Sequence, residues 1–326
     1  MDTFSILKTL TEIESPSGKE AALAKHLLEY LKSLGYDAFI EDLNLLLSPE
    51  KDFIVATHLD TFKILAPFSF DGEYAYGTGV CDAKASITAI LLALERIDRL
   101  NFGIALFHDE EKSGKGSEIF CKKYKPKKAV VMEPTNLTIA NVHYGGLEIR
   151  IRAEGIAAHG ATPEKGENAI EKCVKIITDL KRIEDVIVSV QFLSGGNEED
   201  YMIPDRCKMR VELTFKPHLK AGEVLEEIKR ICQDNVELVV KEVHNGFVSR
   251  DVVKIIERAV MGAGLKVRFS EMPSWSDAVN LHYLANCDTA SFGPGELYLR
   301  HTRKERVKLR DIELAAQVLI ALNSII

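Results

Sequence analysis

The chain has 326 residues, a length that favours two domains over one. Apolar residues make up 46% of it and charged residues 28%, which is typical of globular proteins and excludes collagen-like and disordered classes. Lysine and arginine number 42 against 49 for aspartate and glutamate, and the resulting net charge of -7 argues against a protein that binds nucleic acid.

The N-terminal stretch predicts no signal peptide, because acidic residues come early and no apolar segment follows them. The longest apolar run, 87–94, is shorter than the roughly 20 residues that a membrane-spanning helix needs. Six cysteines are scattered without a C-x-x-C pair, which favours reduced thiols over a zinc ribbon or a disulfide framework. These features predict a cytoplasmic protein that does not enter a membrane.

An amphipathic helix is expected over 18–34, with Ser17 and Glu20 as a capping box and Gly35 as its C-terminal stop. A second helical pattern covers 83–96. Short apolar segments typical of strands lie at 53–57, 103–107, 128–132 and 289–292. Strands that alternate with helices predict an α/β domain with a largely parallel sheet.

The pattern changes in the middle of the chain. Strands are expected at 147–153, 186–192, 207–215 and 236–243, with helices at 166–180 and 220–232. This β-α-β-β-α-β order predicts a ferredoxin-like unit. Because helix and strand alternation resumes after it, we expect an insertion at 147–244 between two parts of one α/β domain, 1–146 and 245–326.

Ionisable residues follow the expected strands of the α/β domain. His58 and Asp60 end one apolar segment, Glu110 and Glu111 follow the next, and Glu133 follows a third. Ligands of open parallel sheets bind beyond the carboxyl ends of the strands, so these side chains are expected to converge. Imidazole and carboxylate donors suit zinc, cobalt or manganese.

The residue types at three places in the sequence each suit a specific role in a metal site. Residues two apart in an extended chain point the same way, so Asp60 can orient the His58 imidazole. Of the neighbours Glu110 and Glu111, one can bind metal while the other takes a proton from a metal-bound water. Asp82 follows a glycine-rich turn, where it either caps a helix or bridges two metals.

The ordered motifs resemble a known family. They are ATHLDT, YGTGVCDAK, LFHDEEKSGKGS, VVMEPT, GIAAHGATPEKGENAI, YMIPD, SDA and GPGELYLRHTRKERV. Over about residues 15–307 the chain resembles the dinuclear-zinc deacylases and exopeptidases, which include acetylornithine deacetylase, succinyl-diaminopimelate desuccinylase, aminoacylase and carboxypeptidase G. The resemblance implies a zinc-exopeptidase-like catalytic domain with a mostly parallel central sheet, plus an inserted ferredoxin-like α+β dimerisation (lid) domain.

The resemblance also implies a cofactor and a ligand set. Two divalent metal ions are expected, zinc first, with cobalt or manganese as alternatives, and Asp82 would bridge them. The other implied ligands are His58 and Glu133 for one ion and Glu111 and His301 for the second. Glu110 would be the general base and later the acid, Asp60 would orient His58, and the peptide bond after Asp82 would be cis.

His159 lies in the inserted unit, away from the strand ends of the α/β domain. The resemblance implies a homodimer formed through residues 147–244, in which the matching histidine reaches a neighbouring active site and stabilises the tetrahedral oxyanion. Dimerisation would then be required for catalysis.

The implied activity is metal-dependent hydrolysis of a C–N amide bond. An N-acyl amino acid deacylase of arginine or lysine biosynthesis, similar to acetylornithine deacetylase, is favoured. A hydrolase that releases lysine or ornithine from an acidic amino-group carrier protein is one alternative, and a dipeptidase or carboxypeptidase is another. A catalytically inactive metal-binding scaffold would be expected to have lost ligands, and none of them is missing.

Departures from the family pattern bear on the substrate. His143–Tyr144 stands where members that take succinyl substrates carry an arginine pair, and the N-x-I-P motif begins with Tyr201, which argues against a succinyl-diaminopimelate desuccinylase. Candidates for binding a substrate carboxylate are Arg150, Arg152, Arg206 and Arg300. A basic patch suited to docking an acidic carrier protein comprises Arg300, Arg303, Lys304 and Arg306.

Overall fold

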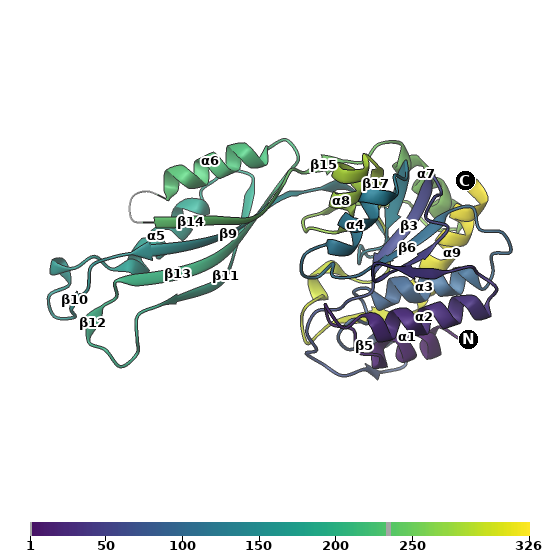
Figure 1. Cartoon of the computed structure of the whole chain (residues 1–326), viewed down its shortest axis with the longest axis horizontal. Coiled ribbons are helices and arrows are strands. Elements are labelled where there is room, and N and C mark those ends of the chain that lie inside the picture. The colour runs from purple at the N-terminus through teal and green to yellow at the C-terminus, as the bar shows by residue number, and fades with distance from the viewer. Residues whose placement is uncertain (1, 233–235) are drawn as a thin grey trace. The chain divides into compact units, whose positions relative to one another are not determined.

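The computed structural model describes residues 2–232 and 236–326, which form two compact units (Figure 1). The first unit comprises 2–141, 249–272 and 276–326, and the second comprises 142–248 and 273–275. The second unit therefore begins five residues before the expected position 147 and ends four after 244. One reason is that its first long strand already pairs at Gly145, which lies opposite Phe215.

The first unit is built on a mixed sheet. Its strands are β1 (Phe39–Glu41), β2 (Asn44–Leu47), β3 (Phe53–His58), β6 (Gly103–Phe107), β7 (Lys128–Val131), β8 (Ile139–His143), β16 (Phe269–Met272) and β17 (Asp288–Ser291). They follow the order β1-β2-β6-β3-β7-β17-β8, and β16 pairs with β8. A smaller sheet joins β18 (Arg306–Lys308), β5 (Tyr74–Tyr76) and β4 (Ser69–Phe70).

Only the centre of the large sheet is parallel. Strands β6, β3, β7 and β17 pair in parallel, whereas β1, β2 and β8 pair antiparallel at the two sides. The expected mostly parallel sheet is therefore mixed. At one side the cause is local, because Asp42 and Leu43 both adopt positive φ and close a tight β1–β2 hairpin, which forces antiparallel pairing.

Helices cover both faces of this sheet. They are α1 (Thr3–Glu12), α2 (Ala21–Ser33), α3 (Lys84–Leu94), α4 (Lys115–Lys123), α7 (Asp251–Gly262), α8 (Asp277–Ala285) and α9 (Leu309–Ile325). In Figure 1, α4 and α8 lie on one side of β3 and β6, and α3 and α9 lie on the other. Every residue of β3 is buried, as expected for a strand covered on both faces.

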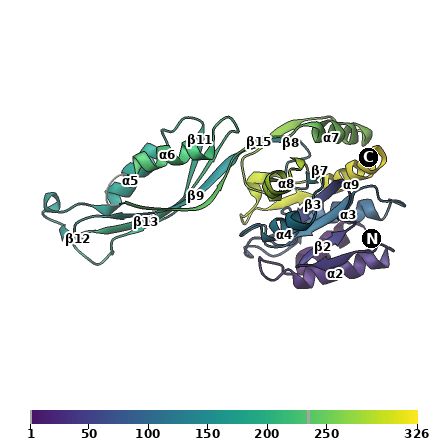
Figure 2. The same ribbon diagram turned by 45° about the horizontal axis from the view of Figure 1, so that its top comes forward.

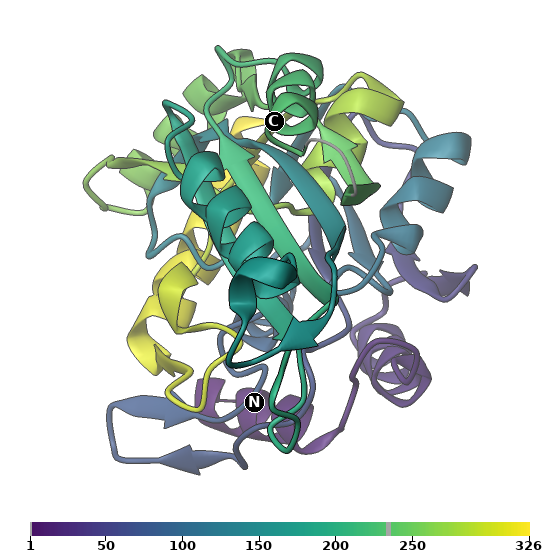
Figure 3. The same cartoon turned by 90° about the vertical axis from the view of Figure 1, so that its left-hand side faces the viewer.

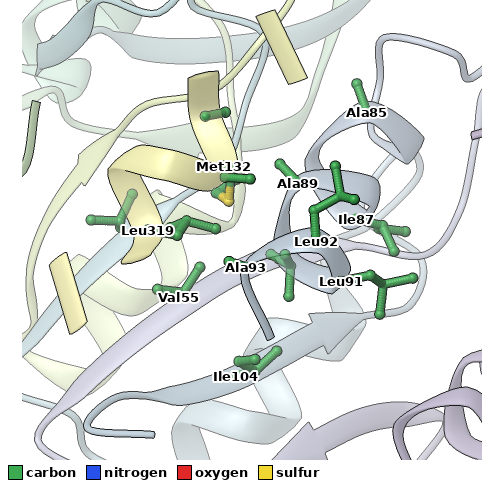
Figure 4. Packing of buried hydrophobic residues seen from close by; sticks show 14 of the residues in the cluster. Val55, Ala85, Ile87, Ala89, Leu91, Leu92, Ala93, Ile104, Met132 and Leu319 are labelled. Atoms are coloured by element: carbon green, nitrogen blue, oxygen red, sulfur yellow. The ribbon is translucent and has the colours of Figure 1, made fainter. Parts of the chain in front are cut away.

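The main apolar core lies between the sheet and α3 and α9. Val55 of β3 and Ile104 of β6 belong to the same buried cluster as Leu91 of α3 and Leu319 of α9 (Figure 4). All eleven residues of α3 are buried, so this helix is an interior element. Since α3 begins two residues after Asp82, its packing also fixes the start of a functional loop.

The expected helix near the N-terminus forms, but its capping box does not. Helix α2 begins at Ala21, with Glu20 at the N-cap and no side-chain cap hydrogen bond. The Ser17 hydroxyl donates instead to Asp60 at 2.7 Å. The segment before the helix is thus tied to the end of β3, which sequence periodicity does not reveal. Gly35, at φ 88°, ends the helix as expected.

The second unit has the predicted β-α-β-β-α-β order. Its long elements are β9 (Gly145–Glu154), α5 (Ala169–Leu180), β11 (Val186–Gly195), β13 (Arg206–Phe215), α6 (Ala221–Ile231) and β14 (Val236–His244). The antiparallel sheet order β11-β13-β9-β14 confirms the ferredoxin-like arrangement. Shorter elements are β10 (Ala158–His159), η1 (Pro163–Lys165), β12 (Met202–Ile203) and β15 (Phe247–Val248).

The second unit has a core of its own. Alternate residues of the central strands, such as Ile149, Ile151 and Val211, pack with Cys173 of α5 and Ile228 of α6. Figure 2 shows α5 and α6 on the same side of β9 and β13, and in Figure 3 the teal helix α5 runs alongside the long strands. Within the described residues, no helix is both long and apolar enough to span a bilayer.

Candidate metal centre

The first group of candidate ligands is buried, and two of its three members lie at the ends of sheet strands. His58 ends β3, Glu133 follows β7 by two residues, and Asp82 precedes α3. Ligand atoms of these three side chains lie within 4.8 Å of one another. The His58 Nε2 atom lies 3.0 Å from Asp82 Oδ1, and the three residues are at most 2% exposed.

The second group shares Asp82 with the first. It adds Glu111, from the segment after β6, and His301, from the loop after the short helix η2 (Leu297–Leu299). The His301 Nε2 atom lies 2.7 Å from Glu111 Oε2 and 3.7 Å from Asp82 Oδ2. Asp82 is thus the one residue common to both groups, and the peptide bond that follows it is cis.

The residues present fit two divalent cations. Buried carboxylate oxygens normally have hydrogen-bond partners, yet Asp82 Oδ2 and both Glu133 oxygens have none within the described chain. Burial and the nearby Asp82 raise the pKa of Glu133 to about 8, and a bound cation would stabilise its ionised form. Imidazole nitrogens with carboxylate oxygens are the donor set of zinc, cobalt and manganese sites.

Asp60 supports the centre in a way that the sequence only partly predicted. The closest partner of His58 Nδ1 is the backbone carbonyl of Asp60 at 2.8 Å, while the Asp60 carboxylate lies at 3.5 Å. That carboxylate accepts the backbone N–H groups of Glu110 and Glu111, both at 3.0 Å. Asp60 therefore positions the segment that carries both glutamates as well as the imidazole.

Glu110 lies in the same buried environment, 6% exposed. Burial raises its pKa well above the ordinary value, and the negative charges of Glu133 and Glu111 add to this, although His58 opposes it. A carboxyl with a raised pKa is suited to accept and return a proton near neutral pH.

Glu305 is a supporting residue that the sequence analysis did not single out. Its carboxylate accepts the backbone N–H groups of Gly79 at 3.1 Å, Cys81 at 2.9 Å and Asp82 at 3.1 Å. Glu305 lies four residues after His301, so its hydrogen bonds join the loop that carries His301 to the loop that carries Asp82. The sequence signal that could have identified Glu305 is its place in the segment HTRKE, which begins with the predicted ligand His301.

Asp277 was also missed, although its SDA motif was noted. It is fully buried at the start of α8, and burial raises its pKa to about 7. Its charge contributes to the raised pKa of Glu110. Asp277 therefore belongs to the electrostatic environment of the centre.

The remaining predicted site residues divide between the two units. Arg300 lies at the metal centre, with its Nη1 atom 3.5 Å from Asp82 Oδ2. Arg150, Arg152 and Arg206 belong to the second unit. So does His159, which is exposed on β10 opposite Met202 and accepts the Ala161 backbone N–H at its Nδ1 atom. Its catalytic role stays a prediction.

Comparison with known proteins agrees with this architecture. The chain is 25% identical to a LysW-lysine/LysW-ornithine hydrolase of Saccharolobus solfataricus over 321 residues, which cover 96% of this chain and 92% of the relative. A tripeptidase structure from Staphylococcus aureus superposes with a TM-score of 0.84 at 19% identity, covering 99% and 97% of the two chains.

A metallo-carboxypeptidase structure from Sulfolobus solfataricus gives a TM-score of 0.82 at 16% identity over 100% and 99% of the chains. At these identities the structural matches establish the fold. The model of peptidase family M20/M25/M40 matches residues 54–323, which include all five predicted metal ligands. The chain therefore belongs to peptidase family M20/M25/M40, a family of metal-dependent hydrolases.

Proposed function

We propose that this protein releases lysine or ornithine from an amino-group carrier protein by hydrolysing the amide bond between them. The observation that carries the proposal is the match, over nearly the whole of both chains, to a relative named for the hydrolysis of LysW-lysine and LysW-ornithine. The complete ligand set supports it, because an inactive scaffold has no need to retain five converging metal ligands. Because of that relative's name, we favour the carrier-linked substrate over the free N-acyl amino acid.

The chemistry divides between the metals and the chain. When bound, two divalent cations supply Lewis-acid activation of a water molecule and of the amide carbonyl. Glu110 takes the proton from that water as the new C–O bond forms, and returns it to the amine nitrogen as the C–N bond breaks. The products are the carrier carboxylate and a free amino acid. Asp60 holds the backbone of Glu110, so it fixes the position of this base.

We further propose that the protein works as a homodimer formed through the second unit, with His159 stabilising the oxyanion in the neighbouring subunit. Two features support a partner on this unit. The ten-residue strand β11 is at the edge of its sheet, and it exposes Ile187, Phe192 and Leu193. Long exposed edge strands with apolar side chains are normally covered in native proteins.

The substrate proposal is tested by comparing kcat/KM for three substrate classes with zinc-loaded or cobalt-loaded protein. These are lysine or ornithine linked to its carrier, N-acetyl-ornithine, and unblocked dipeptides. Carrier-linked substrate is expected to be preferred, because the relative is named for it. The matched control is Glu110→Gln, which keeps the size of the side chain but removes the proposed base. Preference for N-acetyl-ornithine would restore the deacylase interpretation favoured by the sequence.

A further inference from the structure

A cationic side chain lies among the acidic ligands of the metal centre. Arg300 immediately precedes the ligand His301, and its side chain is 14% exposed. One guanidinium nitrogen, Nη1, lies 3.5 Å from Asp82 Oδ2 and 3.9 Å from Glu133 Oε2. His301 adopts a positive φ of 58°, a conformation that non-glycine residues rarely adopt. The side chains of two adjacent residues in this loop, Arg300 and His301, thus both lie at the same centre.

The position of Arg300 distinguishes the two groups of ligands. Asp82 is shared by both groups, whereas Glu133 belongs only to the group that contains His58. The guanidinium therefore lies beside Asp82, which both groups share, and beside Glu133, which is the contact that it makes with the His58 group alone. Among the described residues, Asp82 Oδ2 and Glu133 Oε2 have no hydrogen-bond partner although they are buried, so a divalent cation would stabilise both oxygens.

We infer that Arg300 weakens the binding of the metal ion held by His58, Asp82 and Glu133, so that the two ions bind with unequal affinity. A guanidinium stays charged at any pH at which the protein is folded, so a divalent ion must either bind beside it or displace it. In a site shielded from solvent, like charges a few ångströms apart repel strongly enough to change affinity at least tenfold. The inference rests on the proposed metal centre and on no substrate.

The experiment measures metal affinity directly and needs no turnover. Chelator-stripped wild type, Arg300→Gln, Arg300→Met and Arg300→Lys are titrated with Zn²⁺ or Co²⁺ against a chromophoric chelator, with isothermal titration calorimetry to count the ions. Arg303→Gln is the matched control, because it removes the same charge from an exposed position three residues farther along the loop. Circular dichroism checks that each variant is folded.

Two ions are expected to bind the wild type. Arg300→Gln and Arg300→Met should tighten one of them by at least about tenfold, since both remove the repulsive charge. The other ion should change less, because its ligands do not include Glu133, and Arg300→Lys and Arg303→Gln should stay near wild type. In a Glu133→Gln background, Arg300→Gln should no longer tighten either ion, because the site of the affected ion has already lost its Glu133 ligand.

The results that overturn the inference are distinct from failure of the metal centre. Unchanged affinities in the neutral Arg300 variants, or weaker binding of either ion, would show that the guanidinium does not oppose metal. Tightening by Arg303→Gln to the same extent would show a general charge effect without a role for Arg300. If wild-type protein binds no divalent ion, the metal centre itself is wrong, and the proposed function fails with it.

Discussion

The Glu305 carboxylate accepts the backbone N–H of Asp82 at 3.1 Å and so holds the residue that both metal groups share. The same carboxylate accepts two further N–H groups of the loop, from Gly79 and Cys81. Because it is 3% exposed, water cannot replace it without a local rearrangement. The segment after His301 is therefore part of the support for Asp82.

Glu305→Ala is expected to weaken metal binding by about 10–100-fold, the usual effect of losing a group that orients a ligand. It should also lower the melting temperature, because three buried N–H groups lose their acceptor. Glu305→Gln keeps one acceptor oxygen and should recover part of both losses. Chelator competition and thermal melting measure the two effects, and equal behaviour of the Ala variant and wild type would refute the role.

Glu110 and Glu111 should separate cleanly into a base and a ligand. Glu110→Gln is expected to retain two metal ions while turnover falls by at least about 100-fold, because only the proton acceptor is lost. Glu111→Gln should retain a single ion, since Glu111 belongs to one ligand group, and Asp82→Asn should weaken both ions. Elemental analysis of the purified variants gives the metal content. Loss of metal in Glu110→Gln would contradict the assignment.

The two-subunit role of His159 has a direct test by complementation. Glu110→Gln and His159→Ala homodimers should each be nearly inactive. When the two chains are co-expressed and mix at random, about a quarter of all sites should combine an intact Glu110 with an intact partner His159. Activity near that fraction supports catalysis across the interface. Mixed preparations that stay as inactive as the two parents would contradict a role for His159 in the neighbouring subunit's site.

His244 gives the second unit a predictable response to acid. Its ring packs against Gly146, and burial lowers its pKa from 6.5 to about 4. Between these values the unfolded chain binds a proton that the folded chain does not, so stability is full above about pH 6.5 and falls as the pH drops toward 4. The loss attributable to this group is about 2 kcal/mol at pH 5.

Urea unfolding at neutral pH and near pH 5, followed by fluorescence of the single tryptophan, Trp275 of the second unit, measures this response. In His244→Gln the difference in unfolding free energy between the two pH values should be smaller than in wild type by about this amount. The same difference in both proteins would show that His244 does not control the acid response.

Sequence patterns predicted those features that depend on local periodicity or on a motif. The six elements of the second unit follow from alternation and helical spacing, and its strand order is the one expected for a ferredoxin-like unit. In the first unit, the candidate ligands were identifiable because His58, Glu111 and Glu133 follow apolar strands that meet at one edge of the sheet.

Hydrogen bonds between residues far apart in the chain could not be predicted from the sequence. Ser17 and Glu20 have the spacing of a capping box, but a hydrogen bond from Ser17 to Asp60, 43 positions away, takes the hydroxyl. The support that Glu305 gives to Asp82 joins residues 223 positions apart. Neither partner carries a local pattern that specifies the other, so only the folded chain reveals these contacts.

The central claim is that the metal-loaded protein cleaves lysine or ornithine from its carrier, and mass spectrometry of the carrier tests it most directly. Carrier-linked substrate is incubated with wild type, with Glu110→Gln and with chelator-stripped protein. The account predicts that wild type alone shifts the carrier to the mass of its unloaded form and releases one amino acid per carrier. An unchanged carrier mass, in protein that holds two metal ions and hydrolyses N-acetyl-ornithine or a dipeptide, would contradict it.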